Sequence, residues 1–156
     1  MTYPTPVGHR GLTTGELLGC LRALHCTSPI VVANKRDFLN LYTESDFVAA
    51  TMAGQVYEYE IKVSRRDFLK DRLKLRNRIY TGEAPGLRPN RFWYVTPDAI
   101  LTAEDIPSFA GWLVLRNGVL EQVRRAPLLH RDCHGVTVLM RLARAMRERS
   151  RGKGQG

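Results

Sequence analysis

The sequence predicts an α/β fold, in which helices alternate with the strands of a central sheet. Residues 57–63 (YEYEIKV) alternate between apolar and charged side chains, which is the period of a strand. The period changes at Ser64, and Ser64 with Asp67 three residues later is typical of a helix start. An amphipathic helix beginning at Thr13 precedes this unit, and the aromatic strand 91–96 follows it. This alternation defines the α/β class.

Local signals place the other elements of the first half. Thr13 and Glu16 form a capping box that begins the first helix, and Ser28-Pro29 ends it. Between that helix and the strand of Glu60 we expect a short strand at 30–33, a turn at 34–36, strand-like residues within 38–50, and a hairpin turn at 52–55.

The second half continues with a helix from Arg65 to about Tyr80. Its expected core residues are Phe68, Leu69, Leu73 and Ile79. Lys70, Lys74 and Arg78 lie four residues apart and predict a basic stripe on another face.

Three further elements complete the chain. We expect a helical turn within 102–107 and a hairpin over 113–123, because Asn117-Gly118 suits a type I′ turn. The final amphipathic helix is marked by Val136, Leu139, Ala143 and Met146, flanked by Arg141, Arg144 and Arg147.

The composition predicts one globular domain over residues 1–149, followed by a disordered basic tail at 150–156. The formal net charge of +9 indicates a polyanionic partner, most often nucleic acid, with a membrane surface or simple solubility as alternatives. We expect no membrane span and no signal peptide. The three cysteines favour a reducing compartment, so we expect a cytoplasmic protein.

The strand at 57–63 also carries chemistry. Glu60 and Lys62 are two residues apart, so their side chains point to the same face of the strand. A hard cation binds a carboxylate, and a water or phosphate beside that cation interacts favourably with a lysine.

The order of elements resembles that of the PD-(D/E)xK nuclease superfamily over residues 13–96. In that superfamily one strand begins with an acidic residue, and the neighbouring strand carries a second acid and a lysine. Asp46, Glu60 and Lys62 occupy these places. The longer pattern E-x-K-x-S-x-x-D-F-x-x-D, from Glu60 to Asp71, and the later RFWYVTP resemble the MmcB-like branch, whose members are classed as DNA-repair nucleases.

The resemblance implies a restriction-endonuclease-like core with a mixed sheet, to which the last hairpin and helix are additions. It implies a DNA endonuclease that depends on Mg²⁺ or Mn²⁺ and acts in DNA repair, recombination or phage DNA processing. Asp46, Glu60 and the Ile61 carbonyl would hold the metal, and Lys62 would orient the attacking water. Glu16 is a further candidate ligand. The DNA partner would contact Arg65, Arg66, Lys70, Lys74 and Arg78. A small basic chain of this kind often acts as a homodimer.

Each of these residues also has a structural explanation. Glu58, Glu60 and Lys62 could form a solvated strand face, and Asp46 could flank a turn. Glu16 and Asp67 could serve as helix caps, and the basic stripe could be a solvated helix face. Glu44 competes with Asp46 as a ligand, because it shares the same strand face.

Two further alternatives concern the whole protein. The chain could be a DNA-binding accessory protein that retains a nuclease fold without catalysis. A structural zinc could be held by soft ligands from two segments, although buried thiols and surface imidazoles explain them equally well. These candidate ligands are Cys20, His25, Cys26, His130, Cys133 and His134.

Overall fold

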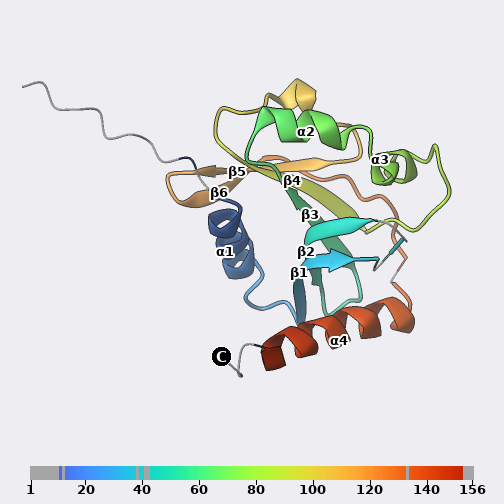
Figure 1. Cartoon of the computed structure of the whole chain (residues 1–156). Helices are drawn as coiled ribbons and strands as arrows, with labels where there is room; N and C mark the ends of the chain where they lie inside the picture. Colours follow the sequence, from blue (N-terminus) through green and yellow to red (C-terminus); the bar gives the residue numbers. More distant parts are fainter. Residues whose placement is uncertain (1–10, 12, 38, 41–42, 133, 153–156) are drawn as a thin grey trace, which may run out of the picture.

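The computed structural model in Figure 1 describes residues 11, 13–37, 39–40, 43–132 and 134–152. The fold is α/β, with helices flanking a six-stranded mixed sheet whose strands follow the order β1 to β6. The elements are α1 (Thr14–Leu24), β1 (Ile30–Arg36), β2 (Glu44–Ala50), β3 (Val56–Ile61), α2 (Arg65–Asp71), α3 (Leu75–Tyr80), β4 (Arg91–Pro97), the 3₁₀ turn η1 (Ala103–Asp105), β5 (Gly111–Arg116), β6 (Val119–Arg124) and α4 (Val136–Gly152).

The sheet combines antiparallel wings with a parallel centre. Strands β1, β2 and β3 form an antiparallel meander, and β5 and β6 form an antiparallel hairpin. Strands β3, β4 and β5 run parallel to one another. Helices α2 and α3 make the crossover from β3 to β4, as a parallel connection requires.

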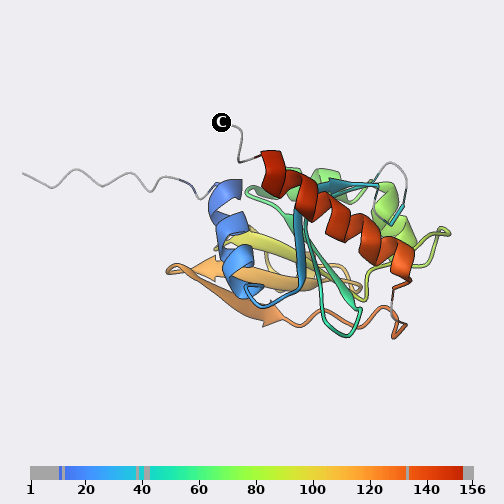
Figure 2. The same ribbon diagram turned by 90° about the horizontal axis from the view of Figure 1, so that it is seen from below.

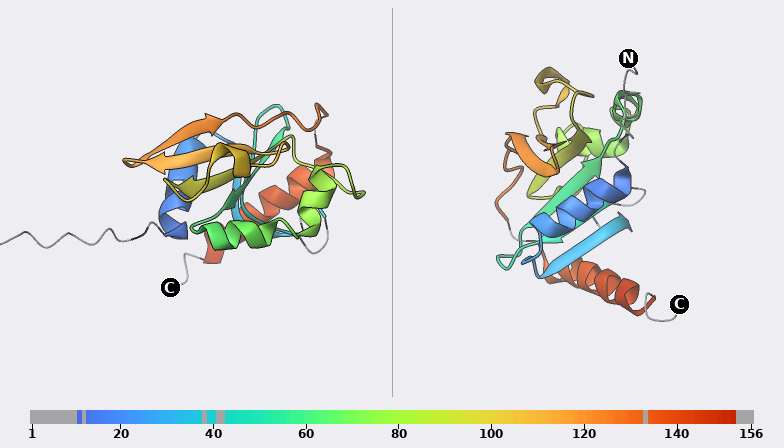
Figure 3. Two further views of the ribbon diagram at one scale, coloured as in Figure 1. Left: turned by 90° about the horizontal axis from the view of Figure 1, so that it is seen from above. Right: turned by 90° about the vertical axis from the view of Figure 1, so that its left-hand side faces the viewer.

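The two faces of the sheet are covered by different helices. On one face, Leu17 and Leu21 of α1 pack against Phe47, Tyr59 and Trp93. On the other face there are two clusters, one beneath α2 and α3 and one beneath α4. Figure 2 shows α4 lying across the strands, and the right-hand view of Figure 3 shows the strands between α2 and α4.

The strand register establishes that these two clusters share a face. Val48 of β2 lies opposite Glu58 of β3, which in turn lies beside Phe92 of β4. Val48 belongs to the α4 cluster, and Phe92 belongs to the α2–α3 cluster. Glu58 and its neighbours on β3 therefore lie between the two helical layers.

Several predicted local signals are confirmed. Thr13 and Glu16 form both halves of the capping box at α1. Asn117 and Gly118 have φ values of 50° and 78°, the left-handed pair that a type I′ turn needs. The short turn η1 falls within 102–107, and the aromatic strand is β4. At Ser64 one of the two expected capping hydrogen bonds is present, in which the Ser64 hydroxyl accepts the Asp67 backbone N–H.

Two predicted boundaries in the first half are wrong. The turn expected at 34–36 is part of β1, because Lys35 and Arg36 pair with Ser45 and Glu44 on β2. The single helix expected from Arg65 to Tyr80 is two helices, α2 and α3. Two of its expected core residues are exposed, Leu69 at 42% and Leu73 at 90%.

The last helix also differs from expectation. It continues to Gly152, so residues 150–152 are helical, and the rest of the expected tail lies outside the described residues. Val138 and Leu142 are its most buried residues, with Leu139 and Met146 packed beside them. In the described part of the chain, none of the helices combines the length and apolar character that a membrane crossing requires.

Glycine positions offer a test of the packing. A Cβ at Gly111 would lie 2.5 Å from the Ala126 nitrogen and 2.5 Å from Trp93 Cδ1, whereas a Cβ at Gly19 in α1 meets nothing within 4 Å. We expect Gly111→Ala to lower the free energy of unfolding by about 2 kcal/mol or more, because backbone must move. Gly19→Ala should raise it by about 0.5–1 kcal/mol, because alanine favours the helix. Urea unfolding measures both, and a neutral Gly111→Ala would contradict this packing.

Candidate active site

Strand β3 and the residue that follows it, Lys62, carry three charged side chains into the interior. Glu58, Glu60 and Lys62 are 1%, 3% and 7% exposed, beneath α2 and α3. The alternative of a solvated strand face is therefore wrong. Buried charges are costly unless they are paired, so the partners of these residues determine what the site can do.

Two lysines join Glu60 to a second buried carboxylate, Asp71 at the end of α2. Lys62 Nζ lies 2.7 Å from Glu60 Oε1 and 3.0 Å from Asp71 Oδ1. Lys74 Nζ lies 3.2 Å and 2.7 Å from the same two oxygens. Each ammonium thus bridges both carboxylates.

Arg76 closes the network from the other side. Its Nη1 donates to Glu60 Oε2 at 2.8 Å, and its Nη2 forms a short contact with Asp71 Oδ2. The guanidinium carbon lies 5.0 Å from the centre of the Phe92 ring, which adds a cation–π contact. Burial opposes the charge, but the attraction of Glu60 and Asp71 outweighs it and raises the pKa of Arg76 well above its usual value.

The same network stabilises the charged forms of Asp71 and Lys74. Burial would raise the pKa of Asp71, but Arg76 and Lys62 outweigh it and hold that pKa well below its usual range. Tyr94 Oη donates to Asp71 Oδ2 at 2.8 Å. Burial would lower the pKa of Lys74, but Glu60 and Asp71 outweigh it and raise that pKa.

The network also explains why the expected helix is broken. In one continuous helix, Lys74 and Arg76 would project about 160° apart, because successive residues turn by about 100°. They could not both reach the same carboxylates. Lys74 instead takes an extended conformation between α2 and α3, with φ −69° and ψ 143°. Asn77 Nδ2 donates to the Asp71 carbonyl at 2.9 Å and satisfies the end of α2.

Glu58 has partners of its own. Its carboxylate accepts a hydrogen bond from the Ser45 hydroxyl at 2.6 Å and a short one from the Tyr80 hydroxyl. Burial raises the pKa of Glu58, partly offset by the charge of Arg76. Glu58 is thus held inside the core, behind Glu60.

Asp46 lies beside Glu60 at the point where β2 and β3 separate. Pairing of the two strands ends at Phe47 and Tyr59. Beyond it, Asp46 Oδ2 accepts the Ile61 backbone N–H at 2.7 Å, in place of a ladder partner. Burial and the charge of Glu60 raise the pKa of Asp46 to about 6. Two acidic side chains therefore lie near each other at this edge of β2 and β3.

One feature of this arrangement favours a bound divalent cation, and another feature opposes it. The mutual repulsion of Asp46 and Glu60 is what a cation would relieve. The Ile61 carbonyl points to the same side of β3 as its N–H, toward Asp46. Both Glu60 oxygens, however, are held by cationic side chains. Among the described residues, no three His, Cys, Asp or Glu side chains are grouped closely enough to form a metal site.

The other candidate ligands lie apart from this edge. Glu16 accepts hydrogen bonds from the Thr13 N–H at 2.6 Å and hydroxyl at 2.9 Å, on a helix that covers the opposite face of the sheet. These contacts support the capping role. Glu44 is exposed and pairs with Arg36 at 3.3 Å.

The histidines and cysteines do not form a zinc site among the described residues. His25 contacts Ser28 and Tyr59, whereas His130 and His134 pack against each other. Cys20 and Cys26 are free thiols, and Cys133 lies outside the described residues.

The expected DNA-contacting residues divide into two groups. Arg66, Lys70 and Arg78 are exposed on α2 and α3. Arg65 pairs with Asp105 at 2.5 Å, and Lys74, which is half-exposed at the break between α2 and α3, pairs with Asp71 at 2.7 Å. The continuous stripe expected from Lys70 to Arg78 is therefore wrong.

Sequence reasoning missed the residues that hold Glu60 in place. Asp71 belongs to the pattern that begins at Glu60, but the sequence does not identify it as a part of the site. Arg76 gave no signal, because an arginine in a polar helix reads as solvated. The sequence offers one indirect signal for such residues. Acidic side chains on a strand between two helical layers are buried, and buried carboxylates require cationic partners.

Comparison with known proteins adds the fold alone. No sequence family model and no curated protein matches the chain. A solved structure of SPO1766, a protein of unknown function from Silicibacter pomeroyi, is similar with a TM-score of 0.66 and 20% identity. The match covers 94% of this chain and 92% of the other. The two chains share their architecture over nearly their full lengths.

Arg76 should dominate the stability of the site. Arg76→Ala leaves Glu60 and Asp71 buried with one cationic partner fewer, and we expect it to lower the free energy of unfolding by about 3–5 kcal/mol. Arg78→Ala is the matched control, because this arginine is exposed on the same helix, and should change it by less than about 0.5 kcal/mol. Equal effects of the two changes in urea unfolding would refute the central role of Arg76.

The raised pKa of Asp46 predicts an unusual pH dependence. The charged form of Asp46 destabilises the folded state. The contribution of Asp46 to the free energy of unfolding is therefore most favourable below the ordinary pKa of 3.8, and this stability is lost as the pH rises through about 6. Asp46→Asn keeps an oxygen for the Ile61 N–H but carries no charge. We therefore expect the variant to gain stability relative to the wild type between pH 5 and pH 8. Urea unfolding at both values measures this, and a difference that shrinks with rising pH would disprove it.

Proposed function

We propose that this protein is a Mg²⁺- or Mn²⁺-dependent DNA endonuclease that hydrolyses phosphodiester bonds. The observation that supports the proposal is the meeting of Asp46, Glu60 and Lys62 at one edge of β2 and β3. Two neighbouring carboxylates, one of them in contact with a lysine, are groups that metal-assisted hydrolysis of a phosphodiester uses. The resemblance to PD-(D/E)xK nucleases places the same three residue types at these positions.

Asp46, Glu60 and the Ile61 carbonyl would hold the metal. When bound, the ion would polarise the phosphate and acidify a water molecule. Lys62 and Lys74 both contact Asp71 as well as Glu60, so each keeps a carboxylate partner if Glu60 turns to a cation. Arg76 and Asp71 thereby hold the Lys62 ammonium near the reacting phosphate, where its charge stabilises the transition state.

One observation favours the accessory protein without catalysis. Lys62, Lys74 and Arg76 together occupy both oxygens of Glu60. If these contacts persist in the presence of metal and DNA, the cluster acts as a structural core. DNA would then be bound through exposed basic residues such as Arg66 and Lys70.

A cleavage assay separates these functions. Wild-type protein should cut plasmid or branched DNA with Mg²⁺ or Mn²⁺ and lose this activity in a chelator. Glu60→Gln should lose metal binding and cleavage together, because the amide is a poor ligand for a hard cation. Lys62→Met should keep metal binding but lower single-turnover cleavage by about a hundredfold or more.

Lys70→Ala is the control, because Lys70 is exposed and lies outside the charge network. It should retain the cleavage step and weaken DNA affinity modestly. Urea unfolding of each variant confirms that it is folded under the assay conditions. Wild-type protein that binds DNA but cuts no substrate with either metal would establish the accessory function instead. A Lys62→Met variant that cleaves at the wild-type rate would remove Lys62 from the mechanism.

A further inference from the structure

Helix α4 is strongly divided between an apolar side and a basic side. Its apolar side packs Val138 and Leu142 against Val32 and Val48 of the sheet. Its sequence carries five arginines and one glutamate. Arg141, Arg144, Arg147 and Arg151 recur every three or four residues and form the arginine face of α4.

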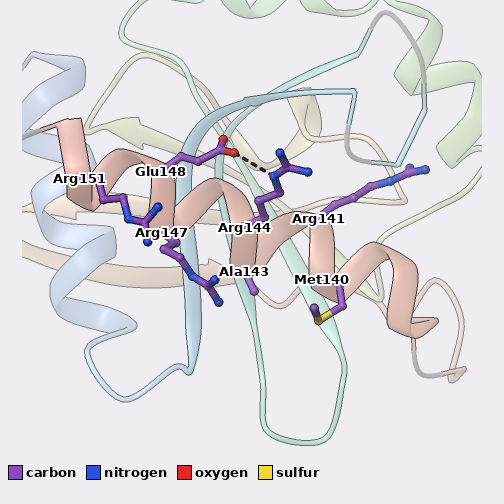
Figure 4. A pocket seen from close by; sticks show the side chains of 7 residues that line it. All are labelled: Met140, Arg141, Ala143, Arg144, Arg147, Glu148 and Arg151. Atoms are coloured by element: carbon purple, nitrogen blue, oxygen red, sulfur yellow. Dashed lines mark hydrogen bonds and ion pairs between the residues drawn. The ribbon is translucent and has the colours of Figure 1, made fainter.

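The arginine face points away from the sheet. Figure 4 shows these four side chains extending around an open hollow that is lined by α4 residues, together with the exposed Met140. Glu148 is the acidic residue of this helix, and it pairs with Arg144 at 2.9 Å. Both partners are largely exposed, so this pair contributes little to stability and is readily exchanged. The face therefore offers concentrated positive charge to a polyanion.

The packing of α4 argues against a membrane as that polyanion. A basic amphipathic helix binds a bilayer by inserting its apolar side among the lipids. In this protein the apolar side of α4 is already buried against β1 and β2, where Val138 is 8% exposed and Leu142 is 0% exposed. A nucleic acid requires no such insertion, since its phosphates bind arginine side chains directly.

The C-terminal end of α4 is fixed to strand β1 by an arginine outside the arginine face. Arg149, near the end of α4, donates to the Asn34 carbonyl of β1 at 2.6 Å. The β1–β2 register pairs Ala33 with Phe47 and Lys35 with Ser45, so Asn34 lies opposite Asp46. The C-terminal end of α4 therefore contacts the β1 residue that lies opposite Asp46 of β2.

We propose that the arginine face of α4 binds the sugar–phosphate backbone of duplex DNA. This surface is separate from the basic residues of α2 and α3, and it lies on the other side of β3. The inference takes the identity of the partner from the proposed function, but it requires no catalysis. Backbone binding of this kind is independent of sequence and falls steeply with salt.

The test is DNA binding in the absence of divalent metal, so that cleavage plays no part. The α4 variant is Arg147→Gln with Arg151→Gln, which keeps the Arg144–Glu148 pair and similar helix propensity. The control is Arg125→Gln with Arg131→Gln, which removes the same charge from exposed positions outside α4. Fluorescence anisotropy of a short labelled duplex is measured between about 50 and 200 mM salt.

The α4 variant should bind at least about tenfold more weakly than the control at the lowest salt. Its plot of log affinity against log salt should be shallower by nearly two, because each lost phosphate contact contributes about 0.9. Equal binding by the two variants would overturn the inference, even if the protein cleaves DNA. A loss of binding to anionic phospholipid vesicles with unchanged DNA binding would also overturn it. If the α4 variant binds DNA more weakly as expected but the wild-type protein cuts no substrate, the DNA-binding surface is supported and the nuclease proposal is refuted.

Discussion

The structure depends on the contact between Arg76 and two buried carboxylates. Glu60 and Asp71 come from a central strand and from a helix above it, and each would be very costly to bury alone. Arg76 binds both, and its planar guanidinium suits a bridge between two carboxylates. Replacing an entire buried ion cluster by apolar residues is often neutral, but removing one member is not. Removing Arg76 alone is therefore expected to cost more stability than replacing the whole cluster.

This constraint determines the local chain path. The chain ends α2 at Asp71, extends at Lys74, and begins α3 so that both Lys74 and Arg76 reach the carboxylates. Leu73 is exposed at this break as a consequence. The same constraint leaves Asp46 at the margin of the cluster, next to Glu60. Arg76 binds Glu60 directly, whereas no ion pair of Asp46 is found among the described residues. The position of the cationic side chains thus has two results: both oxygens of Glu60 are paired, and the pKa of Asp46 is raised.

Sequence reasoning succeeded where a structure follows from a few adjacent residues. The capping box of Thr13 and Glu16 and the turn at Asn117-Gly118 are local rules, and both are confirmed. It failed where distant partners decide. Lys35 extends β1 because β2 offers a pairing edge. In the candidate site, strand period predicts that Glu60 and Lys62 share a face, and the resemblance to PD-(D/E)xK nucleases implies a place for Asp46 near them. The burial of Glu60, which depends on α2, α3 and Arg76, could not be predicted.

The order of the strands has a consequence for how the chain folds. Each strand pairs with its neighbours in sequence, so the sheet can grow one strand at a time as the chain leaves the ribosome. Helix α4 is the exception, because it returns from the end of the chain to cover β1 and β2. Val32 and Val48 therefore present an apolar surface to water until α4 has been synthesised. During that interval the nascent chain can aggregate through this apolar face, and the packing of α4 against the face then removes it from water.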